Sequence, residues 1–148
     1  AEKGFAFLDL CRKRFDVVLM NPPFGAMTDM VNEYAREAYP IGYIDLYTAF
    51  VDRGLSLGLE QALVGAITSR TCFALSSFKK WREESFLGST NLVNVLDLGD
   101  AVLDNAMVET AAYSISKQAS DSTSLFIDVE RVQIGQRIHL IYWKVKKT

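Results

Sequence analysis

The sequence predicts an α/β fold with a mainly parallel sheet and antiparallel edge strands. Two short apolar runs, residues 15–20 and 62–68, are typical of buried parallel strands, and a helical spacing of apolar residues separates them. A helix pattern follows the second run, and the rest of the chain has the pattern of consecutive strands. Strands that first alternate with helices and then follow one another directly favour a parallel sheet with an antiparallel edge.

Two helices are expected between the first two strands. Apolar side chains recur at helical spacing over residues 27–39, where Thr28 or Asp29 is placed to cap the start and Pro40 ends the pattern. A glycine-containing loop then leads to Asp45, which is the expected N-cap of the next helix. The second strand follows that helix.

The remaining elements are one helix and a series of strands. The helix is expected to begin at Ser76 or Ser77 and to reach about residue 87, where Gly88 closes it. Strands are expected at residues 91–98, 109–117, 125–132 and 137–145, with a turn at residues 120–123 and a hairpin turn at Gly135.

Composition narrows the class of protein. The chain of 148 residues fits one domain, and its 49% hydrophobic and 23% charged residues are typical of a globular protein. A net charge of −2 provides no overall basic field, so a nucleic-acid partner would have to be held by local patches. No apolar run approaches the roughly 18 to 20 residues that span a bilayer, so no membrane contact is expected. Cys11 and Cys72 are widely spaced and there is one histidine, which argues against a disulfide framework or a metal site and favours a reducing cytoplasm.

The most informative segment is the loop Asn21-Pro22-Pro23-Phe24, directly behind the first apolar strand. In open α/β sheets, ligands bind outside the carboxyl ends of the strands. Neither proline has an N–H to donate, and each fixes its own φ angle, so the loop is stiff and presents mainly acceptors. The acceptors are the Asn21 side-chain oxygen and the backbone carbonyls of the loop. Two such acceptors suit a planar amino group, which has two hydrogens to donate, and Phe24 can stack on the attached ring. The alternative is an ordinary turn with an aromatic that fills the core.

These residues resemble the amino-group DNA methyltransferases that use S-adenosylmethionine, whose catalytic motif NPPF matches. The resemblance extends to the ordered segments DLYTAFVDRGLSLGLEQALVGAITSRTCF and FKKWREESFLGSTNLVNVLDLGDAVLDNAMVETAAYSISK. It is strongest for the adenine-specific methylases of type IIG restriction–modification and BREX phage-defence systems. The fold that it implies is the C-terminal half of a Rossmann-like methyltransferase, with DNA as the partner of the full-length protein.

The resemblance also implies roles for individual residues. Asn21 and the Pro22 carbonyl would accept hydrogen bonds from the amino group of an adenine flipped out of the duplex, Pro23 would stiffen the loop, and Phe24 would stack on the base. Three further positions are candidates for substrate or cofactor contacts: Tyr113, Asp45 and Ser69. Tyr113 also fits a core position, and Asp45 a helix cap.

The chain departs from the family where the cofactor is bound. No glycine-rich loop precedes residue 15, and the stretch VLDLGDAVLD fits the late strand of the family better than a cofactor loop. We therefore expect residues 1–148 to be one partial catalytic domain, with the resemblance over residues 15–117 and an antiparallel extension over 118–148. The main S-adenosylmethionine motif is expected upstream, and the isolated fragment is expected to be inactive.

Two other functions fit the same loop. Methyltransferases of RNA bases, or of a glutamine in release factors, resemble this chain in using Asn-Pro-Pro-aromatic to hold an amino or amide group. The long spacer from Phe24 to Asp45 and the stretch DLYTAF favour the DNA class. A non-catalytic methyltransferase-like module is the third hypothesis, and the intact loop argues against it.

Overall fold

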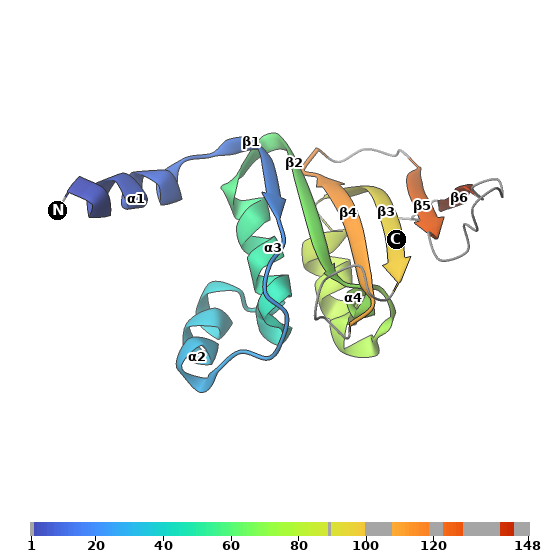
Figure 1. The fold of residues 1–148 in the computed structure, drawn as a ribbon, viewed down its shortest axis with the longest axis horizontal. Coiled ribbons are helices and arrows are strands. Elements are labelled where there is room, and N and C mark those ends of the chain that lie inside the picture. The colour runs from blue at the N-terminus through green and yellow to red at the C-terminus, as the bar shows by residue number, and fades with distance from the viewer. Residues whose placement is uncertain (1, 89, 100–107, 119–122, 129–139, 144–148) are drawn as a thin grey trace.

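The computed structural model describes residues 2–88, 90–99, 108–118, 123–128 and 140–143 of the chain. Its strands form one sheet in the order β1-β2-β4-β3-β5-β6, and the helix at residues 46–57 packs on one face of it, whereas the first helix extends away from the sheet (Figure 1). The strands are β1 (Phe15–Met20), β2 (Gly58–Ser69), β3 (Asn91–Gly99), β4 (Thr110–Ser116), β5 (Ser124–Asp128) and β6 (Leu140–Trp143). This architecture is the expected α/β class.

The sheet is mixed. The expected sheet was mainly parallel, with antiparallel strands only at its edge, whereas the observed sheet also has an antiparallel strand in its interior. β1 pairs with β2 in parallel, and so does β3 with β5. β6 is antiparallel to β5 at the outer edge, as expected. β4 is also antiparallel, but it lies inside the sheet between β2 and β3. The reason is that the crossover from β2 to β3 leaves one strand position vacant, and the chain turns back into it after β3.

The helical segments differ from the expectation mainly after β2. They are α1 (Glu2–Arg12), α2 (Asp29–Ala38), the 3₁₀ turn η1 (Gly42–Ile44), α3 (Leu46–Leu57), α4 (Thr71–Ala74), the 3₁₀ turn η2 (Ser76–Phe78), α5 (Lys79–Trp81) and the π turn η3 (Arg82–Phe86). After β2, helical structure thus starts at Thr71 and consists of several short segments, whereas the sequence predicted one continuous helix from Ser76 or Ser77. The π turn brings Trp81 and Phe86, five residues apart, into one packed pair with ring centroids 5.0 Å apart.

The core lies between the sheet and the helices. It is a single cluster to which α3 contributes Tyr47 and Val51, β2 contributes Val64, and the segment after β2 contributes Trp81 and Phe86. These elements share one cluster, so α3 and the segment 71–86 cover the same face of the sheet. Of the described helices, none is long and apolar enough to cross a membrane.

β1 is the outer strand of the sheet, and this corrects the expectation that residues 15–20 form a buried strand. Val18 and Met20 pack on the core beneath α3, whereas Val17 is 55% and Leu19 78% exposed. On β2, Leu63 is exposed on the same side. Side chains alternate between the faces of a strand, so the face away from α3 is apolar but lacks cover among the described residues. The strand itself has the expected bounds.

The expected turn at residues 120–123, the hairpin turn at Gly135 and the outer parts of the last two expected strands lie outside the described residues.

A carboxylate joins α3 to the segment after β2. Asp52 Oδ1 accepts a hydrogen bond of 2.9 Å from Trp81 Nε1, and Trp81 itself is buried. Burial raises the pKa of Asp52 from 3.8 to about 6, although the hydrogen bonds from Trp81 and Ser85 lower it. The folded protein therefore binds a proton at Asp52 more tightly than the unfolded chain does.

We predict that this proton makes stability depend on pH. Between about pH 4 and pH 6 the folded state holds more protons, so the free energy of unfolding falls as pH rises, by on the order of 2 kcal/mol. The variant Asp52→Asn keeps an acceptor for Trp81 and should lose this fall. Urea unfolding at several pH values measures it, with Asp16→Asn at an exposed position of β1 as control. An unchanged slope in Asp52→Asn would contradict the assignment.

Candidate active site

The loop Asn21–Phe24 lies at the carboxyl end of β1, as the sequence predicts. Asn21 and Pro23 are exposed, Pro22 is buried, and Phe24 is half-buried. The Asn21 amide makes no hydrogen bond to any other described residue. Asn21 borders an open hollow of about 440 Å³, whose other lining residues are Leu19, Met20, Gly65, Ala66 and Ile67. The Asn21 amide is therefore available at a surface that another molecule can reach.

The far end of the loop is hydrogen-bonded to the start of α3. Gly25 N donates to Asp45 Oδ1 at 3.2 Å, and Leu46 N donates to Gly25 O at 3.0 Å. Gly25 has a φ angle of +123°, which L side chains rarely adopt, although a Cβ there would meet no atom within 4 Å. The requirement for glycine is therefore conformational and not steric.

Asp45 is the N-cap of α3, which confirms the sequence-based expectation. It forms a capping box in which Asp45 Oδ1 accepts from Tyr47 N at 3.3 Å and Asp45 N donates to Thr48 Oγ1 at 3.1 Å. Burial raises the pKa of Asp45, while hydrogen bonds from the backbone of Tyr47, Gly25 and Leu46 lower it.

The Phe24 ring is oriented by the same turn of α3. It packs edge-on against Tyr47, with ring centroids 6.1 Å apart and an interplanar angle of 85°. Tyr47 is 2% exposed and also stacks on Phe78, with ring centroids 5.8 Å apart. Its hydroxyl lies 3.4 Å from Thr71 Oγ1. Phe24 thus rests on a fixed aromatic layer and is partly exposed above it.

Ser69 belongs to the support of the site and not to its surface. It is 4% exposed, its hydroxyl lies 2.9 Å from Thr71 Oγ1, and it accepts a hydrogen bond from Thr71 N at 3.3 Å. Because Thr71 also contacts Tyr47, Ser69 is linked to the layer beneath Phe24. Ser69 is thus a supporting residue in the structure. Its side chain is not exposed, so the structure offers no support for the expected contact between Ser69 and substrate or cofactor.

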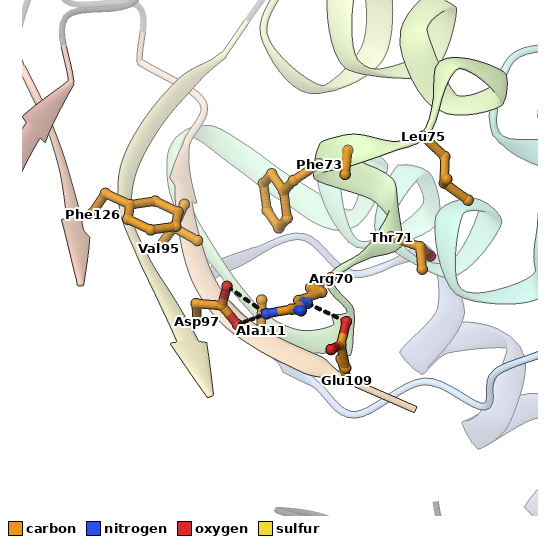
Figure 2. Close-up of a pocket in the computed structure, with 10 residues that line it drawn as sticks. Arg70, Thr71, Phe73, Leu75, Val95, Asp97, Glu109, Ala111 and Phe126 are labelled. Atoms are coloured by element: carbon orange, nitrogen blue, oxygen red, sulfur yellow. Dashed lines mark hydrogen bonds and ion pairs between the residues drawn. The ribbon is translucent and has the colours of Figure 1, made fainter. Parts of the chain in front are cut away.

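A second cavity lies near the carboxyl ends of β2 and β3, and the sequence analysis did not predict it. Its volume is about 400 Å³, and Figure 2 shows Arg70 at its rim between Asp97 and Glu109. Arg70 Nη1 lies 3.1 Å from Asp97 Oδ2, and Arg70 Nε donates to Glu109 Oε2. The walls are mainly apolar, with Phe73, Leu75, Val95, Ala111 and Phe126 among the lining residues. Residues so far apart in the chain meet only because β4 lies between β2 and β3.

Residues 2–103 of the chain match the family described as Eco57I restriction-modification methylases. The chain belongs to this family. The matched residues include the whole Asn21–Phe24 loop, its anchor at Asp45 and the second strand, so the resemblance found from the sequence over residues 15–117 and this match share residues 15–103.

A curated relative of this Eco57I-family chain agrees with the assignment. The chain is 28% identical over 111 residues to the adenine-specific methyltransferase PglX of Lacticaseibacillus casei (strain Zhang), covering 71% of the chain and 9% of that protein. The chain thus spans a small part of its curated relative.

Two solved structures show the fold. A Listeria monocytogenes protein described as a class I S-adenosylmethionine-dependent methyltransferase superposes with a TM-score of 0.62 at 15% identity, over 78% of this chain and 37% of that one. The ATP-dependent type ISP restriction-modification enzyme LlaBIII, bound to DNA, superposes with a TM-score of 0.69 at 11% identity, over 87% of this chain and 11% of that one. The expected methyltransferase fold is confirmed.

Neither a metal site nor the main cofactor motif is found in the described part of this methylase chain. No three His, Cys, Asp or Glu side chains converge there to hold a metal ion. The hollow beside Asn21 is apolar apart from Asn21, with no charged side chain in its lining. Its lining therefore offers one side-chain amide, that of Asn21, and no charged partner for the amino and carboxylate groups of an amino acid.

Tyr113 lies in the core of the methylase chain, and we withdraw it from the candidate base contacts. It is 3% exposed, and its ring packs edge-on against Phe73 and Phe86 at centroid distances of 5.4 and 5.3 Å. Thr68 Oγ1 donates a hydrogen bond of 3.3 Å to its hydroxyl. β4 lies between β2 and β3, and on this strand Tyr113 faces the helices. Its side chain is therefore not exposed at the carboxyl end of β1, where the Asn21–Phe24 loop lies.

We predict that Tyr113→Phe lowers stability without lowering methyl transfer. Loss of the hydroxyl removes one buried hydrogen bond, which costs about 1 kcal/mol in the free energy of unfolding. Thr68 Oγ1 retains Ser69 O as an acceptor. Urea unfolding of the chain measures the first effect, and single-turnover methylation by the complete protein measures the second. A tenfold fall in the methylation rate at unchanged stability would return Tyr113 to the site.

Proposed function

We propose that the complete protein transfers a methyl group from S-adenosylmethionine to the exocyclic amino group of adenine in DNA. The observation that carries this proposal is the stiff acceptor loop Asn21–Phe24, whose Asn21 side chain is exposed at the carboxyl end of β1 in a chain of the Eco57I methylase family. The name of the PglX relative, an adenine-specific methyltransferase, supports adenine as the target. The DNA-bound state of LlaBIII supports DNA as the partner.

In this proposal the loop holds the amino group and prepares its nitrogen. The Asn21 side-chain oxygen and the Pro22 carbonyl accept one hydrogen bond each from the two N–H groups of the base. Two acceptors placed in this way draw the hydrogens out of the ring plane, so that the nitrogen lone pair leaves conjugation with the ring. The nitrogen then becomes nucleophilic without a strong base nearby.

Phe24 is the stacking platform in the same proposal. A base can contact the exposed part of its ring while Tyr47 holds the other part from the edge. Contacts of this type contribute about 1–3 kcal/mol per base in nucleic-acid complexes. The target base has to leave the duplex to reach the loop, so the reaction requires base flipping.

S-adenosylmethionine, when bound, supplies a methyl group on a positively charged sulfur. The hollow beside Asn21 would receive the methyl group itself, an apolar group for which Leu19 and Met20 are suitable contacts. We propose that a glycine-rich loop and an acidic residue from an upstream segment hold the remaining parts. A reducing cytoplasm is the compartment in which we expect this reaction.

The uncovered side of the sheet supports the proposal that residues 1–148 are one partial catalytic domain. β1 is an outer strand paired in parallel with β2 on one side, and its Val17 and Leu19 side chains form an exposed apolar patch, which is typical of a surface that another segment covers. We propose that an upstream segment pairs with β1 and covers this face. The core of the domain would then be residues 15–117, with residues 118–148 as an antiparallel extension.

The alternatives named above gain no specific support. A methyltransferase of RNA bases or of a release-factor glutamine would use the same acceptor loop, but neither the family nor the relatives point to those substrates. A non-catalytic module would not require the exposed Asn21 and the anchored Gly25 together.

We predict that Asn21→Ala in the complete protein lowers methyl transfer to DNA by roughly 100-fold or more, as loss of one preorganised hydrogen-bonding group does in other enzymes. The affinity for S-adenosylmethionine should stay within twofold, since the side chain acts on the amino group. Transfer of a radiolabelled methyl group to adenine in duplex DNA is the measurement. The control is Asn32→Ala, which removes an amide that accepts a hydrogen bond from Arg36 on α2. Equal rates for both variants would refute the role of Asn21, and label in RNA or protein alone would select another substrate.

We also predict that cofactor binding needs the upstream segment. The isolated chain should show no saturable binding of S-adenosylmethionine in calorimetry at concentrations at which the complete protein is saturated. Adding the upstream segment should restore binding and should also protect the backbone amides of β1 from hydrogen exchange. Tight one-to-one binding by the isolated chain would show that the described residues already contain the cofactor site.

A further inference from the structure

The catalytic loop is attached to the rest of the molecule at two ends. Its near end continues from β1, which is paired with β2 up to Met20 and Ala66. Its far end is Gly25, whose N–H and carbonyl are both bonded to the first turn of α3, at Asp45 Oδ1 and Leu46 N. Between these ends the two prolines restrict the backbone. The anchor at Gly25 therefore determines where a short, stiff segment points.

The segment that follows Gly25 in the chain cannot provide this anchor. It leads into α2, in which the side chain of Ala35 alone is buried, while Met30 and Tyr34 are largely exposed. A helix that packs so little apolar surface holds its neighbours weakly. By contrast, α3 is part of the main core through Tyr47 and Val51. Contact with α3 is thus the rigid attachment of the loop.

Asp45 does more at this junction than cap a helix. A cap needs one side-chain oxygen that accepts from the first turn, and the bond from Tyr47 N fulfils that need. The same Oδ1 atom also accepts from Gly25 N, which belongs to the loop and lies 20 residues earlier in the chain. Meanwhile Tyr47, two residues after Asp45, touches the Phe24 ring. One turn of α3 thereby contacts both the backbone and the aromatic ring of the loop.

We propose that Asp45 is a positioning residue for methyl transfer: by holding Gly25 N, its carboxylate sets the placement of Asn21 and Phe24 against the target base. This inference rests on the function proposed above. It assigns Asp45 no contact with substrate or cofactor. Loss of the Gly25 bond should therefore slow the chemical step and leave the affinities for DNA and cofactor unchanged.

Three variants of the complete protein separate anchoring from capping. Asp45→Asn keeps an Oδ1 acceptor of the same reach and is as good a cap, so it should retain the single-turnover rate within threefold. Asp45→Ser is also a good cap, but its side chain is one bond shorter and does not reach Gly25 N. Asp45→Ala removes both functions. We expect Ser and Ala variants to lose at least tenfold in rate, while the Ser variant keeps the melting temperature of the wild type.

Two further readouts distinguish a positioning role from a structural one. Hydrogen exchange should speed up at least tenfold at the Gly25 amide in Asp45→Ser, whereas the Tyr47 amide keeps its protection because the cap remains. The dissociation constants for DNA and for S-adenosylmethionine should stay within twofold of the wild type. A wild-type rate in Asp45→Ser, or unchanged exchange at Gly25, would overturn the positioning role.

The same experiment separates this inference from the proposed function. If the wild-type protein methylates adenine and Asn21→Ala does not, a normal rate in Asp45→Ser overturns the positioning role alone. If the wild-type protein transfers no methyl group to adenine in DNA, both the function and the role of Asp45 in it are overturned.

Discussion

The junction between Gly25 and the first turn of α3 is the contact that fixes the Asn21–Phe24 loop to the core. Two backbone groups of Gly25 and one carboxylate join a loop at the sheet edge to a helix of the core. A loop that must present acceptors cannot satisfy them internally, so its rigidity has to come from its ends and from its prolines. The aromatic layer formed by Phe24, Tyr47 and Phe78 then adds a packed support below the loop.

The sheet has two unlike faces, and this asymmetry bears on how the chain works. One face is closed by α3 and the segment 71–86, with a continuous core. The other carries exposed Val17, Leu19 and Leu63 beside the loop. Exposed apolar surface of this kind often belongs to an interface with another segment or protein. A chain that makes up 9% of its PglX relative is consistent with this face being covered in a larger protein.

The position of β4 determines which residues meet near the carboxyl ends of β2 and β3. Since β4 lies antiparallel between β2 and β3, its first residues stand beside the ends of both neighbours. Arg70, Asp97 and Glu109 are thereby brought into one ion-pair cluster, although each comes from a different strand end. The same placement turns Tyr113 toward the helices, where it packs between Phe73 and Phe86. Strand order thus decides which of these side chains lie at the edge and which lie in the core.

The sequence by itself determined the strand before the loop, the loop, the cap at Asp45 and the α/β class, because these follow from local signals. Apolar periodicity, proline geometry and capping residues act over a few neighbouring positions. Tertiary structure alone decided the internal place of β4, the π turn at residues 82–86, the burial of Ser69 and Tyr113, and the bond from Gly25 to Asp45. Apart from the π turn, each of these depends on residues far apart in the chain, and spacing along a sequence does not say which distant segments become neighbours.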